Sequence, residues 1–206
     1  MKFLHCPVIS CIAVSIALLL APVGALQAPA WASPPEAIIG RCQAPPSIDG
    51  ALSPGEWDQT TQLAAFSLVG LNRLAADQTA CFVCFDDEHL YIAFDCPQAT
   101  APVTGATDQA RGGAVWQDDA VEVFVREGTS NTYYHLLGNS ISQVMDEKNR
   151  DASWDGDWRY VAAPTATGWA AEMAVPISTI KWVPKAGTRL GFNAARDRQS
   201  KRPENS

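Results

Sequence analysis

The chain has 206 residues, of which 47% are hydrophobic and 18% charged, and its net charge at neutral pH is −7. This composition is typical of a soluble globular domain with one sizeable core. The basic residues form no patch that would neutralise phosphates, so we expect neither nucleic acid nor an anionic membrane surface as a partner.

Residues 1–32 are predicted to be a secretory signal peptide. Lys2 supplies a positive start, Ile9 to Leu20 form an apolar stretch, and Ala30-Trp31-Ala32 is an A-x-A cleavage site. The apolar stretch is too short for a membrane span, so we expect no membrane insertion after cleavage. The mature chain is therefore expected to be exported, to the periplasm or the extracellular space.

An extended lead-in is expected at residues 33–46, which are rich in Pro and Ala. Ser53-Pro54-Gly55-Glu56 combines a cap, a Pro at the first helical position and an acid three residues after the cap. That pattern predicts one short helical turn carrying Trp57. Residues 47–206 are predicted to form the single folded domain.

The rest of the domain reads as short strands separated by turns. Apolar and polar residues alternate in segments that predict strands at about 62–69, 79–86, 90–96, 119–126, 131–138, 140–146, 158–163, 168–175 and 188–196. Two predicted hairpins turn at Asp86 to His89 and at Gly138 to Ser140. Only the Trp57 turn and Ser178 to Ile180 look helical. The pattern favours an all-β fold, an antiparallel β-sandwich.

Four cysteines remain after signal cleavage: Cys42, Cys81, Cys84 and Cys96. An even number in an exported protein predicts two disulfides, and three connectivities are open. Cys81 and Cys84 lie three residues apart in one predicted strand, so their side chains point to opposite faces and should not pair with each other.

The candidate site begins in the long loop at 97–118, a length more typical of functional loops than of idle ones. Trp116 lies near its end, followed by Asp118, Asp119 and Glu122 at the start of the next predicted strand. An aromatic ring can stack on a sugar, and neighbouring carboxylates can accept hydrogen bonds from its hydroxyls. This combination is typical of a sugar-binding site. Three other tryptophans fit core positions: Trp57, Trp169 and Trp182.

Other kinds of site fit the sequence less well. A glycosidase needs two carboxylates at a set separation across the sugar, and nothing in the sequence fixes such a separation, so we expect no enzyme. Asp155 and Asp157 offer oxygen ligands for calcium without the EF-hand pattern. His135 with Met145 or Met173 would supply two axial ligands to a haem.

Several segments follow one another in an order that is typical of one family. Ser47 to Trp57 contains Ile-Asp-Gly and ends in Glu-Trp, Asp87 to Phe94 contains Leu-Tyr-Ile, and Trp116 to Phe124 reads Trp-Gln-Asp-Asp-Ala-Val-Glu-Val-Phe. Segments 133–139, 168–176 and 191–196 come next. Together they resemble the family 9 carbohydrate-binding modules over about residues 42–206, nearly the whole predicted mature chain.

The resemblance implies an immunoglobulin-like or DOMON-like antiparallel sandwich that binds oligo- or polysaccharide without catalysis. Sugar-binding members of that family clamp a sugar between two Trp rings. Trp116 corresponds to the first ring, Glu122 to the acid that follows it, and His135 to a polar strand position. We expect Trp116 to stack on the sugar, and Asp119, Glu122 and Asn139 to hydrogen-bond its hydroxyls.

The family pattern also sets expectations beyond these residues. The second Trp and the last strand belong to a segment that would begin near Ser206, so we expect both to be missing here. Calcium is a structural ion in some members, and no other cofactor is expected. An accessory role in polysaccharide catabolism, beside a glycoside hydrolase, fits the resemblance. Two alternatives stay open: a haem-binding domain of the related cytochrome group, and a structural leader domain of a larger outer-membrane protein.

Overall fold

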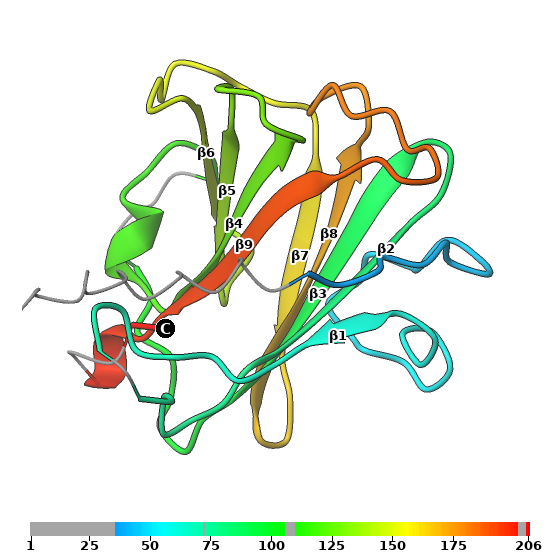
Figure 1. Ribbon diagram of the computed structural model, residues 1–206. Helices are drawn as coiled ribbons and strands as arrows, with labels where there is room; N and C mark the ends of the chain where they lie inside the picture. Colours follow the sequence, from blue (N-terminus) through cyan, green and yellow to red (C-terminus); the bar gives the residue numbers. More distant parts are fainter. Residues whose placement is uncertain (1–35, 72, 106–109, 202–204) are drawn as a thin grey trace, which may run out of the picture. The chain divides into compact units, whose positions relative to one another are not determined.

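Two antiparallel sheets face each other in the computed structural model of the chain (Figure 1). The structure describes residues 36–71, 73–105, 110–201 and 205–206, and the predicted signal peptide lies outside them. The folded unit spans Ala37–Ser206. Within the described residues, no helix is both long enough and apolar enough to cross a membrane.

The strands are arranged as five in one sheet and four in the other, counted over the described residues. The five-stranded sheet has the order β1 (Thr61–Leu63), β2 (Ala80–Phe85), β3 (His89–Pro97), β8 (Gly168–Pro176) and β7 (Arg159–Pro164). The four-stranded sheet has the order β6 (Val144–Lys148), β5 (Tyr134–Asn139), β4 (Ala120–Glu127) and β9 (Leu190–Asp197). Two short 3₁₀ helices are η1 (Val115–Gln117) and η2 (Gln199–Lys201). The prediction of an all-β sandwich is confirmed.

Each predicted strand overlaps an observed one, and the differences have local causes. The first was expected to reach residue 69 but ends at Leu63, because Ala65 has a φ of +64°, which an extended strand does not allow. The second hairpin turns two to three residues later than predicted, at residues 140–143, where Ser142 has a φ of +67°. The predicted helical segments at Trp57 and Ser178 to Ile180 are turns.

The space between the sheets is filled by the apolar side of each strand. Val121, Val123 and Val125 of β4 point there and are at most 1% exposed, as their alternation predicts. They meet Ile92 and Phe94 of β3 in the same core cluster. Burial of each such side chain contributes about 1.5–3 kcal/mol before the entropy of ordering is subtracted.

The outer side of the five-stranded sheet is covered by the segment that precedes β1. Glu172 of β8 is fully buried there and accepts hydrogen bonds from the backbone N–H groups of Asp49 and Gly50 and from Trp57 Nε1, at 2.8–2.9 Å. Burial raises the pKa of the Glu172 carboxyl, although the three donors act in the opposite direction. A side chain at residue 50 is excluded, because Gly50 has a φ of +86° and its Cβ would lie 3.0 Å from Ala163.

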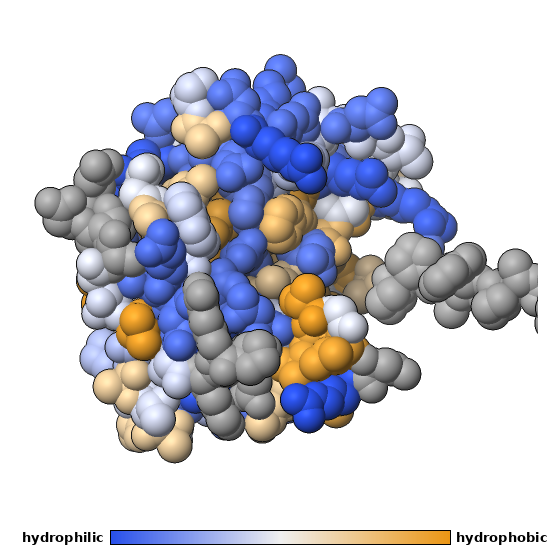
Figure 2. Space-filling view, turned by 90° about the vertical axis from the view of Figure 1, so that its left-hand side faces the viewer, coloured by the Kyte–Doolittle hydropathy of each residue, from blue (hydrophilic) through white to orange (hydrophobic). Residues whose placement is uncertain are grey.

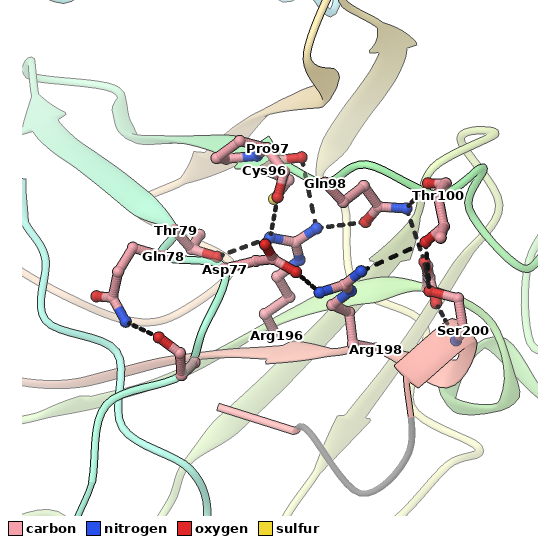
Figure 3. A network of polar contacts seen from close by, with 12 residues as sticks. Asp77, Gln78, Thr79, Cys96, Pro97, Gln98, Thr100, Arg196, Arg198 and Ser200 are labelled. Carbon is pink, nitrogen blue, oxygen red and sulfur yellow. Dashed lines mark hydrogen bonds and ion pairs between the residues drawn. The ribbon is translucent and has the colours of Figure 1, made fainter.

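A buried arginine joins the two sheets at one end of the sandwich (Figure 3). Arg196 of β9 is 1% exposed. It donates hydrogen bonds to Thr79 Oγ1 and the Pro97 carbonyl, both at 3.2 Å, and to the Gln98 side chain. Gln98 Nε2 in turn donates to Asp119 Oδ2 at 3.0 Å. These acceptors offset part of the cost of burying the guanidinium charge, although Arg196 Nε itself has no hydrogen-bond partner among the described residues.

Candidate functional site

The side of the four-stranded sheet that points away from the core carries the candidate site. We call it the outer face, formed by the outward side chains of β4, β5, β6 and β9. The register places Phe124 beside both His135 and Asn193, and places His135 beside Glu147. Figure 2 looks at the side of the molecule where these strands and η1 lie, and hydrophilic residues cover its upper and central parts, with hydrophobic patches below.

Glu122 and His135 form a close polar pair on this face. His135 Nε2 lies 2.7 Å from Glu122 Oε2, and His135 Nδ1 lies 3.9 Å from Glu147 Oε2. The imidazole stacks on the Phe124 ring with centroids 3.9 Å apart and an interplanar angle of 11°. The side chains of Glu122 and His135 remain 17% and 13% exposed, so the pair is held in place yet reaches the surface.

The charge of Glu122 follows from these contacts. Burial raises the pKa of the Glu122 carboxyl, but its hydrogen bonds with His135 and Asp197 outweigh burial, so the pKa lies below its ordinary value. The carboxylate is therefore ionised at neutral pH and acts as a hydrogen-bond acceptor. A hydroxyl-rich ligand on this face would meet a fixed acceptor beside an imidazole.

Trp116 lies on η1 at one end of the outer face. The preceding residue, Val115, is fully buried and packs with Leu137, which lies directly opposite Glu122 in the β4–β5 register. The carbonyl of Trp116 accepts a hydrogen bond from Gln199 Nε2 at 2.8 Å. Trp116 as a whole is 46% exposed. A fixed backbone thus presents a bare aromatic surface to solvent.

Asp119 and Asn139, which the sequence also suggested as sugar contacts, are fully buried. The two Asp119 oxygens accept hydrogen bonds from Gln98 Nε2, from the backbone N–H groups of Gln199 and Ser200, and from Ser200 Oγ. Asn139 donates to the Asp118 and Gln143 side chains. The structure therefore brings Glu122 and His135 together on the outer face, leaves Trp116 exposed on η1 at its end, and gives Asp119 and Asn139 a role in the framework.

A family model described as "Carbohydrate family 9 binding domain-like" matches residues 48–204. The chain belongs to this carbohydrate-binding family. Modules of family 9 are binding modules and are generally non-catalytic. No curated protein matched the chain.

Solved structures of family 9 share the fold. A carbohydrate binding module family 9 from Caldicellulosiruptor kristjanssonii in complex with cellotriose is 16% identical, with a TM-score of 0.60 over 82% of this chain and 80% of that chain. One from the same organism in complex with glucose is 18% identical, with a TM-score of 0.57 over 77% of this chain and 76% of that chain. At these identities the likeness concerns the fold.

The two methionines suggested as haem ligands with His135 lie on different sides of the four-stranded sheet. Met173 is fully buried between the sheets, whereas His135 lies on the outer face and is already bonded to Glu122. Met145 is 8% exposed and packs under Val115. In the β5–β6 register, Met145 is the diagonal neighbour of His135 on the outer face, so of the two suggested methionines only Met173 is separated from His135 by the sheet.

Asp155 and Asp157 were suggested as calcium ligands, and the structure gives Asp155 a different partner. Asp155 forms an ion pair with Arg111 at 2.9 Å. Among the described residues, no group of three or more His, Cys, Asp or Glu side chains is placed to hold a metal ion together. A calcium site in this family 9 module remains a prediction.

Two further outer-face residues were not among the predicted site residues. Phe124 shares the parity of Glu122 along β4, so alternation places it on the same face, although it was not predicted to be part of the site. Glu147 required the β5–β6 register, which depends on where the hairpin turns. The larger hollow described, about 390 Å³ beside Trp57 and Phe82, lies on the other sheet and has no such acid–imidazole pair.

Proposed function

We propose that this family 9 module binds saccharides non-catalytically on its outer face. Trp116 would stack on the apolar face of a sugar ring, while Glu122 accepts hydrogen bonds from its hydroxyls and His135 orients that carboxylate. The observation that carries the proposal is the exposed Trp116 ring, held on a fixed backbone at the end of the face that presents the Glu122–His135 pair.

The expected affinity is modest. Aromatic stacking adds about 0.5–1.5 kcal/mol beyond area burial, and a hydrogen bond to a charged group contributes about 1.5–3 kcal/mol. A millimolar complex requires about 4 kcal/mol. Trp116 and Glu122 together supply about that much, so we expect dissociation constants in the millimolar range for single sugars.

The first ligands to test are glucose and cello-oligosaccharides. Family 9 structures with this fold were solved in complex with glucose and with cellotriose. The predicted signal peptide supports a role outside the cytoplasm, where the module would hold an exported protein, such as a glycoside hydrolase, on polysaccharide. Localisation of a reporter fused to residues 1–32 would test the export step separately.

Ligand titration followed by isothermal calorimetry and by NMR tests the binding proposal. Glucose, cellotriose and xylotriose are titrated into the mature chain to about 20 mM, well above the expected dissociation constants. Trp116→Ala should abolish measurable binding with little change in thermal stability, since Trp116 is 46% exposed and belongs to none of the core clusters of the described residues. Val183→Ala is the matched control, because Val183 is 52% exposed and lies outside the outer face.

Two outcomes would count against the proposal. One is the absence of heat and of NMR shifts with every sugar. The other is binding that Trp116→Ala leaves unchanged, which would move the site away from this face.

A further inference from the structure

The cysteines of the described residues carry free thiols and fall into two neighbouring pairs on opposite sides of the five-stranded sheet. Cys42 and Cys84 belong to the cluster on the outer side of that sheet, together with Trp57. Cys81 and Cys96 belong to the core between the sheets. Cys81 and Cys84 thus face opposite sides of β2, as their spacing predicts.

The backbone holds Cys42 beside the end of β2. The Cys42 N–H donates to the Phe85 carbonyl at 2.9 Å, and the Phe85 N–H donates to the Gly40 carbonyl at 3.3 Å. Arg41 and Phe85 form the in-register pair of this short parallel bridge, and the Arg41 guanidinium lies over the Phe85 ring. Because neighbouring side chains alternate, Cys42 and Cys84 point together to the opposite side.

The two thiols contact each other directly. A hydrogen bond joins the Cys42 and Cys84 side chains. Cys42 is half-buried, whereas Cys84 is fully buried. Burial raises the pKa of both thiols, and the Cys84 partner acts in the opposite direction on the pKa of Cys42. Cys42 is therefore the thiol that an oxidant in solution reaches first.

The second pair has a different geometry. Cys81 lies opposite Phe94 in the β2–β3 register, so Cys96 is its diagonal neighbour, two residues away. Diagonal neighbours on adjacent strands are about 7–8 Å apart, whereas the Cα atoms of a disulfide usually lie about 4.4–6.8 Å apart. Both thiols are also fully buried. Bridging them would require the two central strands to move.

We propose that Cys42 and Cys84 form the single disulfide of the folded domain, and that Cys81 and Cys96 stay as thiols. The Cys42 thiolate attacks a disulfide oxidant, such as oxidised glutathione, and forms a mixed disulfide while one oxidant thiol leaves. The Cys84 thiolate then displaces the second oxidant thiol. Two thiol protons and two electrons leave the protein, and the oxidant disulfide is reduced to two thiols.

This bridge would fasten the segment that covers the outer side of the five-stranded sheet. The loop it closes runs from Cys42 to Cys84 and contains Asp49, Gly50 and Trp57, the three residues that bind Glu172. Closing a loop of this length removes freedom mainly from the unfolded chain. We expect the oxidised protein to melt roughly 5–15 °C above the reduced one.

Peptide mapping tests the connectivity in the wild-type protein. The folded chain is incubated with oxidised glutathione, denatured, alkylated without reductant and digested. The expected result is a peptide linking Cys42 to Cys84, with Cys81 and Cys96 alkylated. Alkylation of all four positions, or a linked peptide that joins any other two, would overturn the proposal.

Variants separate the bridge from the fold. Cys42→Ser should remove the difference in melting temperature between oxidised and reduced protein, whereas Cys81→Ser should retain it. The reverse pattern contradicts the proposal. If a variant does not fold, the wild-type mapping decides alone. Sugar binding is not involved, so failure here leaves the proposed function standing.

Discussion

His135 Nε2 lies 2.7 Å from Glu122 Oε2 across neighbouring strands, and the imidazole lies flat on the ring of Phe124. The stacking fixes the plane of the imidazole, and the hydrogen bond fixes the carboxylate. The two side chains therefore present one preorganised acceptor group, which reduces the entropy lost when a hydroxyl binds.

Glu122→Gln should weaken sugar binding about tenfold, because it replaces a charged acceptor with a neutral amide and disturbs the bond with His135. Calorimetric titration with cellotriose measures the loss. Glu127→Gln is the control, since Glu127 is an exposed acid at the end of the same strand. Equal affinity for wild type and Glu122→Gln would remove this carboxylate from the site.

The stability of the domain should depend on pH through the same group. The pKa of Glu122 in the folded protein lies below its ordinary value of 4.5. Such a carboxyl contributes stability above the unfolded pKa and loses it as the pH falls through the folded pKa. Urea unfolding between about pH 3 and 6 should therefore show a steeper acid loss for wild type than for Glu122→Gln. Parallel curves would contradict the assigned pKa direction.

Glu172→Gln should destabilise the domain by about 1–3 kcal/mol, because an amide NH₂ would face N–H donors that now bind a carboxylate. Denaturant unfolding gives the change, and Glu88→Gln, an exposed acid in the β2–β3 turn, is the control. Binding of sugar by the folded variant should persist, since Glu172 lies on the other sheet. A wild-type free energy of unfolding would show that the segment before β1 is held by other contacts.

Gly138→Ala should cost about 1–3 kcal/mol or more, through overpacking. A Cβ at Gly138 would lie 2.2 Å from Cζ of Tyr160, whose hydroxyl is fixed by a hydrogen bond to the Asn139 carbonyl at 2.9 Å. Gly40→Ala is the control because a Cβ there meets no atom within 4 Å. Similar melting temperatures for the two variants would mean that Tyr160 moves aside freely.

The sequence predicts the strands well because alternation is a local property. Strand β4 is predicted by the alternation of Val121, Val123 and Val125 alone, without information from any other part of the chain. The end of β1 was not predicted, since a positive φ at Ala65 leaves no trace in the residue type. Strand order could come only from the family resemblance or from the structure.

The candidate site was predicted only in part, for a physical reason. Trp116 could be predicted because it is an aromatic residue in a polar loop, and Glu122 could be predicted from its parity along the strand. Asp119 looked equally available, yet it is buried by η2, about 80 residues further along the chain. Such a long-range contact cannot be deduced from neighbours in sequence.

Because Trp116 is exposed, its fluorescence can report on ligand binding at the outer face. Trp57, Trp158, Trp169 and Trp182 are at most 8% exposed, and Trp154 is half-buried, so a water-soluble quencher such as iodide reaches mainly Trp116 among the described tryptophans. A saccharide lying on that ring would shield it from the quencher and shift its emission to shorter wavelength. Occupancy of the outer face is thus readable in unlabelled protein.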